Sequence, residues 1–218
     1  MNLIRRLPEL AMAGEEWWFD VTRGVRTAGT AFLKDLTILS DASDSKLYMP
    51  VRPRRARQAL RALPIRDYAE YTFIDMGSGK GRMLLLAAEC PFRRILGIEF
   101  AAELHRQAVE NIAACRGIWL RCRQIESVAM DAADFRFPDD NLVLYFFNPF
   151  GCATMRRVLE ELRTSLKRLP RDVLLVTIFP EFEALIGAEG YLRLCRRLHR
   201  CHIYRAYAAG DFRPGRRI

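Results

Sequence analysis

The stretch that decides the fold is YTFIDMGSGKGRMLLLAAEC, residues 71–90. It begins with a short apolar run that contains one acid, Asp75, and it ends with an apolar stretch long enough for a helix. Between the two, glycines stand at alternate positions. This order predicts a strand, a tight glycine turn and a helix. Because glycine allows positive φ and a helix start offers unpaired N–H groups, the turn is suited to a nucleotide-like ligand.

The spacing of this turn, Asp75-x-Gly-x-Gly-x-Gly, separates it from two other glycine-rich loops. It is not the dinucleotide-binding G-x-G-x-x-G pattern, and it is not a P-loop, because Lys80 is followed by Gly81 rather than by Ser or Thr. It resembles the cofactor loop of class I (seven-strand) S-adenosylmethionine-dependent methyltransferases. That resemblance implies S-adenosyl-L-methionine as the cofactor, held in part by Gly77, Ser78, Gly79 and Gly81.

The rest of the chain alternates between apolar runs and amphipathic stretches. Further strands are expected at 94–100, 124–129, 141–147, 173–179, 191–196 and 201–208, and helices at 102–115, 154–169 and near 181–186. Such alternation predicts an α/β fold with a doubly wound, Rossmann-like seven-stranded sheet, mostly parallel with an antiparallel final strand. Ligands of such sheets bind at the carboxyl ends of the strands.

Residues 1–66 precede this core, and we expect them to form a helical extension or lid on a methyltransferase core at 67–218. The cluster EEWWFD, Glu15–Asp20, allows two interpretations: a lid or acceptor surface, or a hydrophobic foot that anchors an N-terminal helix. The spacing of Arg54–Leu63 suits a basic amphipathic helix, which Pro64 ends.

Composition limits the class of protein. A chain of 218 residues suits one α/β domain, and no apolar run reaches the ~20 residues of a membrane helix. The first ten residues lack the apolar core of a signal peptide, so a cytoplasmic location is expected. The six cysteines form no C-x-x-C pair, and no metal site is expected, since Cys195, His199, Cys201 and His202 match no usual ligand spacing. The oligomeric state is left open.

The net charge of +9 allows two explanations. A basic patch could bind nucleic acid or an acidic partner. Alternatively, the excess of arginine over lysine reflects coding bias, with the charge spread over solvated faces, which fits the scatter of arginines along the whole chain.

Acids stand at or just past the ends of three of the expected strands. Asp75 would fix the glycine loop or bind the amino-acid portion of the cofactor, unless it only caps the helix. Glu99 is placed to accept both ribose hydroxyls, because a carboxylate accepts hydrogen bonds and donates none; otherwise it is a surface acid. By resemblance, Asp131 and Ala132 stand where the superfamily binds adenine, although Asp134 is an alternative for the side-chain contact.

The fourth expected strand ends in Asn148-Pro149-Phe150. Amino-methylating members of the superfamily have Asn or Asp, then Pro, then an aromatic residue, at this position. Methyl transfer is an in-line displacement that needs an uncharged nitrogen with its lone pair aimed at the methyl group, and an amide oxygen can accept the amine N–H and orient it. We therefore expect Asn148 and Phe150 in catalysis, with Asn148 also at the cofactor. A turn-forming Asn-Pro is the structural alternative.

DMGSGKGR, GIEF and FFNPFG resemble motifs of two lysine methyltransferase groups, the histone-lysine enzyme without a SET domain and the family acting on the ATP synthase c subunit. FDVTRGVRT and the whole layout resemble uncharacterised bacterial methyltransferases. Both lysine groups carry an aromatic residue before the first strand, which implies that Tyr48 covers the cofactor and takes part in catalysis.

These resemblances favour N-methylation of a protein lysine, so the expected partner is a protein, with Tyr48, Phe147 and Phe150 as aromatic candidates for its pocket. A nucleic-acid base amine is the first alternative, because Asn-Pro-aromatic also serves adenine and cytosine, although the second Pro of N-P-P-Y is missing. A small-molecule methyltransferase and a non-catalytic cofactor-binding subunit are the others. No membrane partner is expected.

Overall fold

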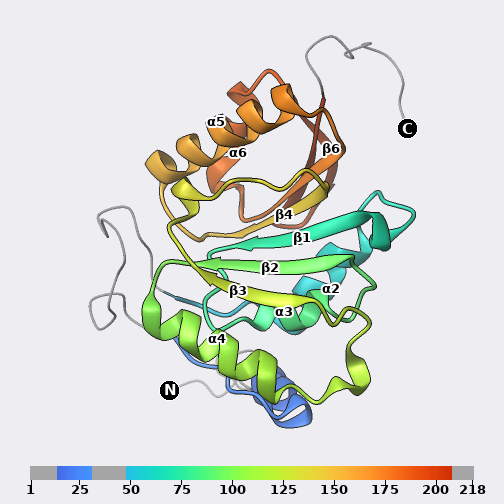
Figure 1. Ribbon diagram of the computed structural model, residues 1–218, viewed down its shortest axis with the longest axis vertical. Coiled ribbons are helices and arrows are strands. Elements are labelled where there is room, and N and C mark those ends of the chain that lie inside the picture. Colours follow the sequence, from blue (N-terminus) through green and yellow to red (C-terminus); the bar gives the residue numbers. More distant parts are fainter. Residues whose placement is uncertain (1–13, 31–47, 208–218) are drawn as a thin grey trace, which may run out of the picture.

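The computed structural model describes residues 14–30 and 48–207 (Figure 1). Within these ranges no helix is both long and apolar enough to cross a membrane. Two parts of the expected N-terminal extension, residues 1–13 and 31–47, and the last residues, 208–218, lie outside the described part.

One seven-stranded sheet organises the molecule, in the order β3-β2-β1-β4-β5-β7-β6. Its strands are β1 (Tyr71–Met76), β2 (Arg94–Glu99), β3 (Ile125–Ala129), β4 (Asn141–Phe147), β5 (Val173–Ile178), β6 (Leu192–Leu198) and β7 (Cys201–Ala206). Pairings among β1 to β5 are parallel, and β7 runs antiparallel to both β5 and β6. The predicted fold class is confirmed, including the single antiparallel strand at the end of the chain.

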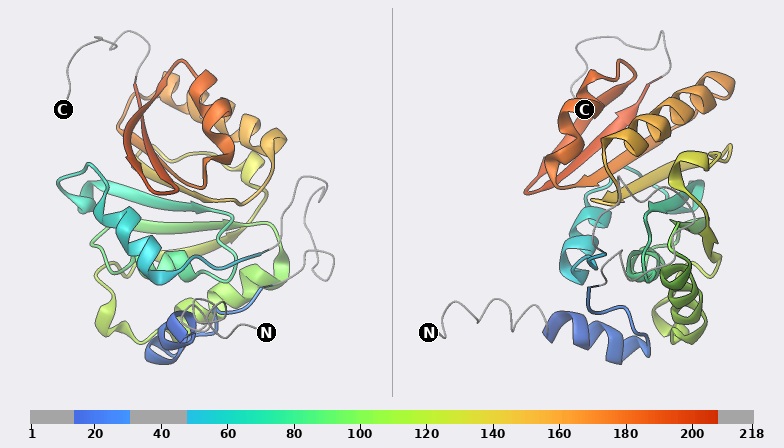
Figure 2. Two further views of the ribbon diagram at one scale, coloured as in Figure 1. Left: turned by 180° about the vertical axis from the view of Figure 1, so that it is seen from behind. Right: turned by 90° about the vertical axis from the view of Figure 1, so that its left-hand side faces the viewer.

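The helices cover both faces of the sheet (Figure 2). They are α2 (Pro53–Arg61), α3 (Arg82–Ala87), α4 (Ala102–Ala114), α5 (Cys152–Arg168) and α6 (Glu183–Ala188), and residues 14–23 are also helical. Short 3-10 turns lie at η3 (Tyr68–Glu70), η4 (Gly117–Trp119), η5 (Ala132–Asp134) and η6 (Pro180–Phe182). One hydrophobic cluster joins α2 and α3 to the sheet, and a second joins α5 and α6 to the opposite face. Both faces are therefore buried, which explains why the central strands are almost wholly apolar.

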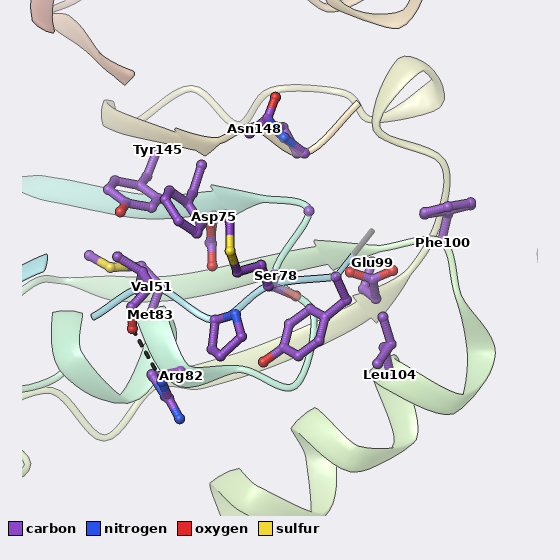
Figure 3. A pocket seen from close by; sticks show the side chains of 16 residues that line it. Val51, Asp75, Ser78, Arg82, Met83, Glu99, Phe100, Leu104, Tyr145 and Asn148 are labelled. Atoms are coloured by element: carbon purple, nitrogen blue, oxygen red, sulfur yellow. Dashed lines mark hydrogen bonds between the residues drawn. The ribbon is translucent and has the colours of Figure 1, made fainter. Parts of the chain in front are cut away.

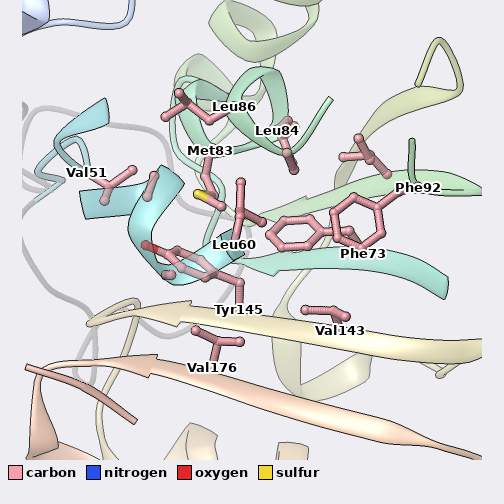
Figure 4. Packing of buried hydrophobic residues seen from close by; sticks show 14 of the residues in the cluster. Val51, Leu60, Phe73, Met83, Leu84, Leu86, Phe92, Val143, Tyr145 and Val176 are labelled. Atoms are coloured by element: carbon pink, nitrogen blue, oxygen red, sulfur yellow. The ribbon is translucent and has the colours of Figure 1, made fainter. Parts of the chain in front are cut away.

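The centre of the sheet alternates its side chains between the two clusters. Phe73, Val143 and Tyr145 lie in the cluster under α2 and α3 (Figure 4), whereas Ile74 and Leu144 lie in the other. These side chains are all almost completely buried. Burial on this scale contributes ~2 kcal/mol for each large apolar side chain and fixes the register of β1 against β4.

Residues on both sides of the expected boundary at residue 66 share one core. Phe19, Val51 and Leu60 are buried in the same cluster as Phe73 of β1. The basic amphipathic helix predicted over Arg54–Leu63 is α2, whose buried face includes Ala56 and Leu60. The division into an extension and a core stays a prediction, but the described part of the extension packs on the core.

The strand order reverses between β1 and β4, because the chain runs outward from β1 to β3 and then returns to the other side of β1. Such a switch point leaves a crevice at the carboxyl ends of the two strands. Met76 of β1 and Phe147 of β4 end at this crevice, so the glycine turn and Asn148 lie next to each other.

Candidate functional site

The glycine turn has the conformation that its sequence predicted. Gly77, Gly79 and Gly81 have φ of 88°, 54° and 82°, in the left-handed region that favours glycine. The N–H groups of Gly77 and Ser78 donate to the Ile98 carbonyl at 2.9 and 3.0 Å, which ties the turn to the end of β2. The turn is therefore held in place by main-chain bonds.

At two of these positions, close neighbours also leave no room for a side chain. A Cβ at Gly77 would lie 2.4 Å from Pro149 Cβ, and a Cβ at Gly79 would lie 2.1 Å from Cε2 of Tyr48. The Asn148-Pro149 segment and the Tyr48 ring thus pack directly on the turn. The three motifs that the sequence places far apart meet here.

Glu99 is buried at the end of β2 and holds the turn from the other side. Its carboxylate accepts the Gly79 N–H at 2.7 Å and the Ala101 N–H at 2.9 Å, one on each oxygen. Burial raises the pKa of Glu99, and these main-chain N–H groups oppose the rise. Each oxygen keeps a second lone pair, so the carboxylate can still accept hydroxyl groups of a ligand.

Asp75 and Tyr145 are register partners on β1 and β4, and both are buried. Burial, with the charge of Glu99 as a smaller cause, holds the pKa of Asp75 well above its usual range. Among the described residues the Tyr145 hydroxyl and the Ser78 hydroxyl have no hydrogen-bond partner. Unpaired buried polar groups next to a hollow are what the polar groups of a ligand would satisfy.

These residues surround one pocket at the carboxyl edge (Figure 3). Figure 3 shows Asp75 and Tyr145 towards one end and Glu99, Phe100 and Leu104 towards the other, with Asn148 at the edge. The lining consists of Tyr48, Met49, Pro50, Val51, Asp75, Gly77, Ser78, Arg82, Met83, Glu99, Phe100, Leu104, Tyr145, Phe147, Asn148 and Pro149.

Tyr48 forms the cover of the glycine turn. Its hydroxyl donates to the Thr27 carbonyl at 3.1 Å, and the Lys80 ammonium lies 5.3 Å from the centre of its ring. Burial raises the pKa of this hydroxyl, so Tyr48 stays neutral at physiological pH.

A buried ionic network fastens residues 14–30 to the helix that follows the turn. Arg82 donates its Nε–H to Thr27 Oγ1 at 2.7 Å, and its Nη atoms lie 3.5 Å from Glu16 and 3.7 Å from Asp20. Asp20 in turn accepts the N–H groups of Thr27 and Ala28 at 2.7 and 2.8 Å. The segment therefore packs against Arg82, a residue that lines the pocket.

The acidic-aromatic cluster of this segment divides into two parts. Phe19 is buried against the guanidinium groups of Arg23 and Arg82, as expected of a hydrophobic foot. Trp17 and Trp18 are 60% and 63% exposed and anchor nothing in the described chain.

Five of the predicted site residues are not among those that line the pocket: Gly79, Gly81, Asp131, Ala132 and Phe150. Phe150 is buried between Phe146 and Phe182, 6.3 Å from each ring, because the chain turns under the sheet into α5 directly after Pro149. Asp131 caps η5 by accepting the Ala133 N–H at 2.8 Å, and Ala132 is buried beside it.

Sequence reasoning left several lining residues unassigned, among them two with polar side chains, Arg82 and Tyr145. Arg82 directly follows the last glycine of the turn, and Tyr145 precedes Phe147 by two residues on β4. Each therefore stands next to a motif that the sequence analysis had assigned to the site. No group of three or more His, Cys, Asp or Glu residues in the described ranges is arranged to hold a metal ion.

Comparison with known proteins gives the fold. No protein-family model matches the sequence, and no curated protein matches it. Among solved structures, a predicted N6-adenine-specific DNA methylase from Listeria monocytogenes has a TM-score of 0.52 at 18% identity, over 73% of this chain and 52% of that one. An RNA methyltransferase from Salinibacter ruber, in complex with S-adenosyl-L-homocysteine, has a TM-score of 0.50 at 18% identity, over 77% and 98%.

The 23S rRNA methyltransferase ErmE is similar at a TM-score of 0.50 and 14% identity, over 75% of this chain and 70% of that one. This chain spans about half the length of the Listeria protein. Together with the seven-strand order, these likenesses show that the chain has the fold of class I S-adenosylmethionine-dependent methyltransferases, as its motifs predicted.

Proposed function

We propose that this protein is an S-adenosyl-L-methionine-dependent methyltransferase that acts on a nitrogen atom. The observation that carries the proposal is the meeting of Asp75, Glu99 and Asn148 around one pocket beside the glycine turn. They come from the ends of three neighbouring strands, at the switch point of a fold whose ligands bind there.

The residues of the pocket fit the proposed cofactor. The unpaired hydroxyls of Ser78 and Tyr145 and the buried carboxyl of Asp75 offer polar partners for an amino-acid portion. Glu99 has free lone pairs for ribose hydroxyls, and the half-buried Phe100 next to it offers an apolar surface for the base. Asp131 and Ala132, beyond β3, are retained as candidates for the adenine contact.

When bound, S-adenosyl-L-methionine supplies a methyl group on a positively charged sulfur. Positive charge beside Asp75 and Glu99 favours the ionised form of both carboxyl groups, and the resulting carboxylates stabilise that charge. Asn148 can accept an N–H of the acceptor through its amide oxygen and so orient the nitrogen lone pair. Tyr48 covers the turn and excludes water.

The half-buried His105 does not face this pocket as a base, because its Nδ1 lies 2.9 Å from Ser127 Oγ. Among the described residues no histidine or lysine lines the pocket, so we expect the acceptor nitrogen to arrive uncharged or to lose its proton to water or to a pocket carboxylate.

A protein lysine is the acceptor that the motif resemblance favours. The aromatic residues Tyr48 and Phe147 at the pocket support it, because an apolar pocket lowers the pKa of an amine and favours its reactive neutral form. A nucleic-acid base amine is the second candidate, and it is favoured by two arginines, Arg55 and Arg200, at the ring of Phe179, which packs on the pocket residue Phe147.

The test combines cofactor binding with methyl transfer. We expect S-adenosyl-L-homocysteine to bind the purified chain in calorimetry, and labelled methyl to pass from S-adenosyl-L-methionine into a cell extract. Loss of label on protease treatment alone would identify a protein acceptor, loss on nuclease treatment alone a nucleic acid, and survival of both a small molecule. Failure to bind either cofactor form would refute the proposal. The expected cytoplasmic location stays a prediction, which cell fractionation checks.

A further inference from the structure

Phe179 directly follows β5, as Asn148 directly follows the neighbouring strand β4. The register pairs Phe147 with Ile178, so the next residues, Asn148 and Phe179, are neighbours across the two strands. Both have left-handed backbones, with φ of 50° and 74°. The Phe179 N–H donates to the Arg200 carbonyl at 2.8 Å, which holds this conformation. A bulky residue in this region is strained, and such strain gathers at functional sites.

Phe179 extends the aromatic wall of the pocket by one strand. Its ring centre lies 5.7 Å from that of Phe147, with 32° between the ring planes, and Phe147 lines the pocket. Phe147 and Phe179 are both half-buried, so part of this aromatic wall is accessible from outside the core.

Two guanidinium groups flank this wall. Arg55 of α2 and Arg200 of the turn between β6 and β7 have Cζ atoms 5.4 and 5.6 Å from the centre of the Phe179 ring. In residues 14–30 and 48–207, neither of them forms an ion pair with a carboxylate, unlike their neighbours Arg57, which binds Glu89, and Arg197, which binds Glu183. The wall therefore carries positive charge that no described carboxylate neutralises.

We infer that the Phe147–Phe179 wall, with Arg55 and Arg200, is the acceptor side of the pocket and takes a base on a phosphate-bearing strand. The inference rests on the proposed function and names its substrate class. A base can stack on an aromatic face and on guanidinium planes, and arginines can contact the adjoining phosphates. A lysine ammonium would meet two like charges on its way to Asn148, which disfavours its approach.

Fluorescence anisotropy tests the inference. The probes are a labelled single-stranded RNA of 12 nucleotides and a DNA of the same sequence, and the protein is saturated with S-adenosyl-L-homocysteine. We expect Phe179→Leu to weaken binding about tenfold, because stacking on an aromatic ring is lost while the apolar volume is kept. We expect Arg55→Gln with Arg200→Gln to weaken binding and to reduce the slope of log affinity against log salt by about 1.4, as for two lost phosphate contacts.

Arg163→Gln is the matched control, because Arg163 is an exposed arginine on α5, on the opposite face of the sheet from α2. Arg163→Gln should change the affinity and the salt slope only by the small effect of removing one distant positive charge. Calorimetry with S-adenosyl-L-homocysteine is run on every variant, so that failure of the proposed function (no cofactor binding) is distinguished from failure of this inference.

The inference is overturned if cofactor binding is intact but Phe179→Leu and the double arginine variant bind both oligonucleotides as well as Arg163→Gln does. It is also overturned if a lysine-containing peptide accepts labelled methyl and the oligonucleotides do not.

Discussion

The two halves of the carboxyl edge differ in chemistry, and the boundary between them is the switch point between β1 and β4. On the β1–β2 side, the strands end in buried carboxylates, Asp75 and Glu99, and in a glycine turn held by main-chain bonds. On the β4–β5 side, they end in an amide, Asn148, and an aromatic ring, Phe179, with two guanidinium groups beside it. One half suits a cationic cofactor, and the other suits an electron-rich, anionic acceptor.

This difference shows how one pocket can separate two substrates. A positively charged cofactor gains from the acidic half and is repelled by the basic half, and a phosphate-bearing acceptor has the opposite preference. Variants confined to one half should therefore change one binding event and leave the other intact.

The largest effect is expected from Gly79→Ala in the cofactor half. Its Cβ would lie 2.1 Å from Cε2 of Tyr48, at a φ of 54° that alanine rarely adopts. We expect affinity for S-adenosyl-L-homocysteine to fall more than about 100-fold, since strain of this kind costs ~3 kcal/mol or more with the clash added. Gly187→Ala on α6 is the control, because no atom lies within 4 Å of its Cβ position. Calorimetry that gives equal affinities for the two variants would contradict the assigned cofactor half.

The next effect is on stability, from Asp20→Ala. This change removes the acceptor of the Thr27 and Ala28 N–H groups and one anionic neighbour of the buried Arg82. We expect the free energy of unfolding to fall by about 3 kcal/mol in urea denaturation. Asp134→Ala, which breaks an exposed pair with Arg157, should cost less than ~1 kcal/mol. Similar losses in the two variants would show that residues 14–30 contribute little to the fold.

Asn148→Ala tests the acceptor half. We expect kcat for methyl transfer to fall about 100-fold, because an orienting hydrogen bond to the reacting amine is lost, while affinity for S-adenosyl-L-homocysteine changes less than about threefold. Asn141→Ala at the opposite end of β4, where its amide accepts the Asp172 N–H, should leave kcat unchanged. Full activity of Asn148→Ala would show that Asn148 takes no part in the reaction.

The smallest effect is expected from Asp75→Asn. Burial raises the pKa of Asp75 in the folded chain above its unfolded value of about 4, so the folded state is penalised as pH rises from ~4 towards the folded pKa. Asparagine carries no such penalty. We expect Asp75→Asn to stabilise the ligand-free protein by about 1 kcal/mol at pH 7–8, with the gain vanishing near pH 4, and to weaken cofactor binding.

Thermal unfolding as a function of pH, with and without S-adenosyl-L-homocysteine, measures this effect. The exposed Asp139→Asn is the control, and its unfolding should not depend on pH in this way. A ligand-free Asp75→Asn protein that is less stable at pH 8 than at pH 4, relative to the unchanged chain, would contradict the buried-carboxyl explanation.

Much of the fold could be predicted because its determinants are local. The glycine spacing of residues 77–81 sets a backbone that only glycine adopts easily, and the apolar run of β4 requires a strand buried on both faces. The acids Asp75 and Glu99 could be placed at the pocket because parallel strands bring their carboxyl ends to one edge.

The aromatic residues of the site could not be assigned in the same way. The sequence predicted Phe150, which follows Asn148-Pro149, but that ring packs against Phe146 and Phe182 in the core. Phe179, about thirty residues later, packs instead on Phe147 at the pocket. Which of the two rings lies at the pocket depends on the direction that the chain takes after each strand, and that direction cannot be read from sequence spacing.

By itself, then, the sequence determined the succession of strands and helices along the chain, the glycine turn and the acids that face it. Each follows from short-range stereochemistry and from the spacing of hydrophobic residues. Only the tertiary structure decided that Tyr48 lies on Gly79, that Arg82 is buried against Asp20 and Thr27, and that Arg55 and Arg200 meet at Phe179. These contacts join segments far apart in the chain, and their geometry is set by how the helices and loops pack around the edge of the sheet.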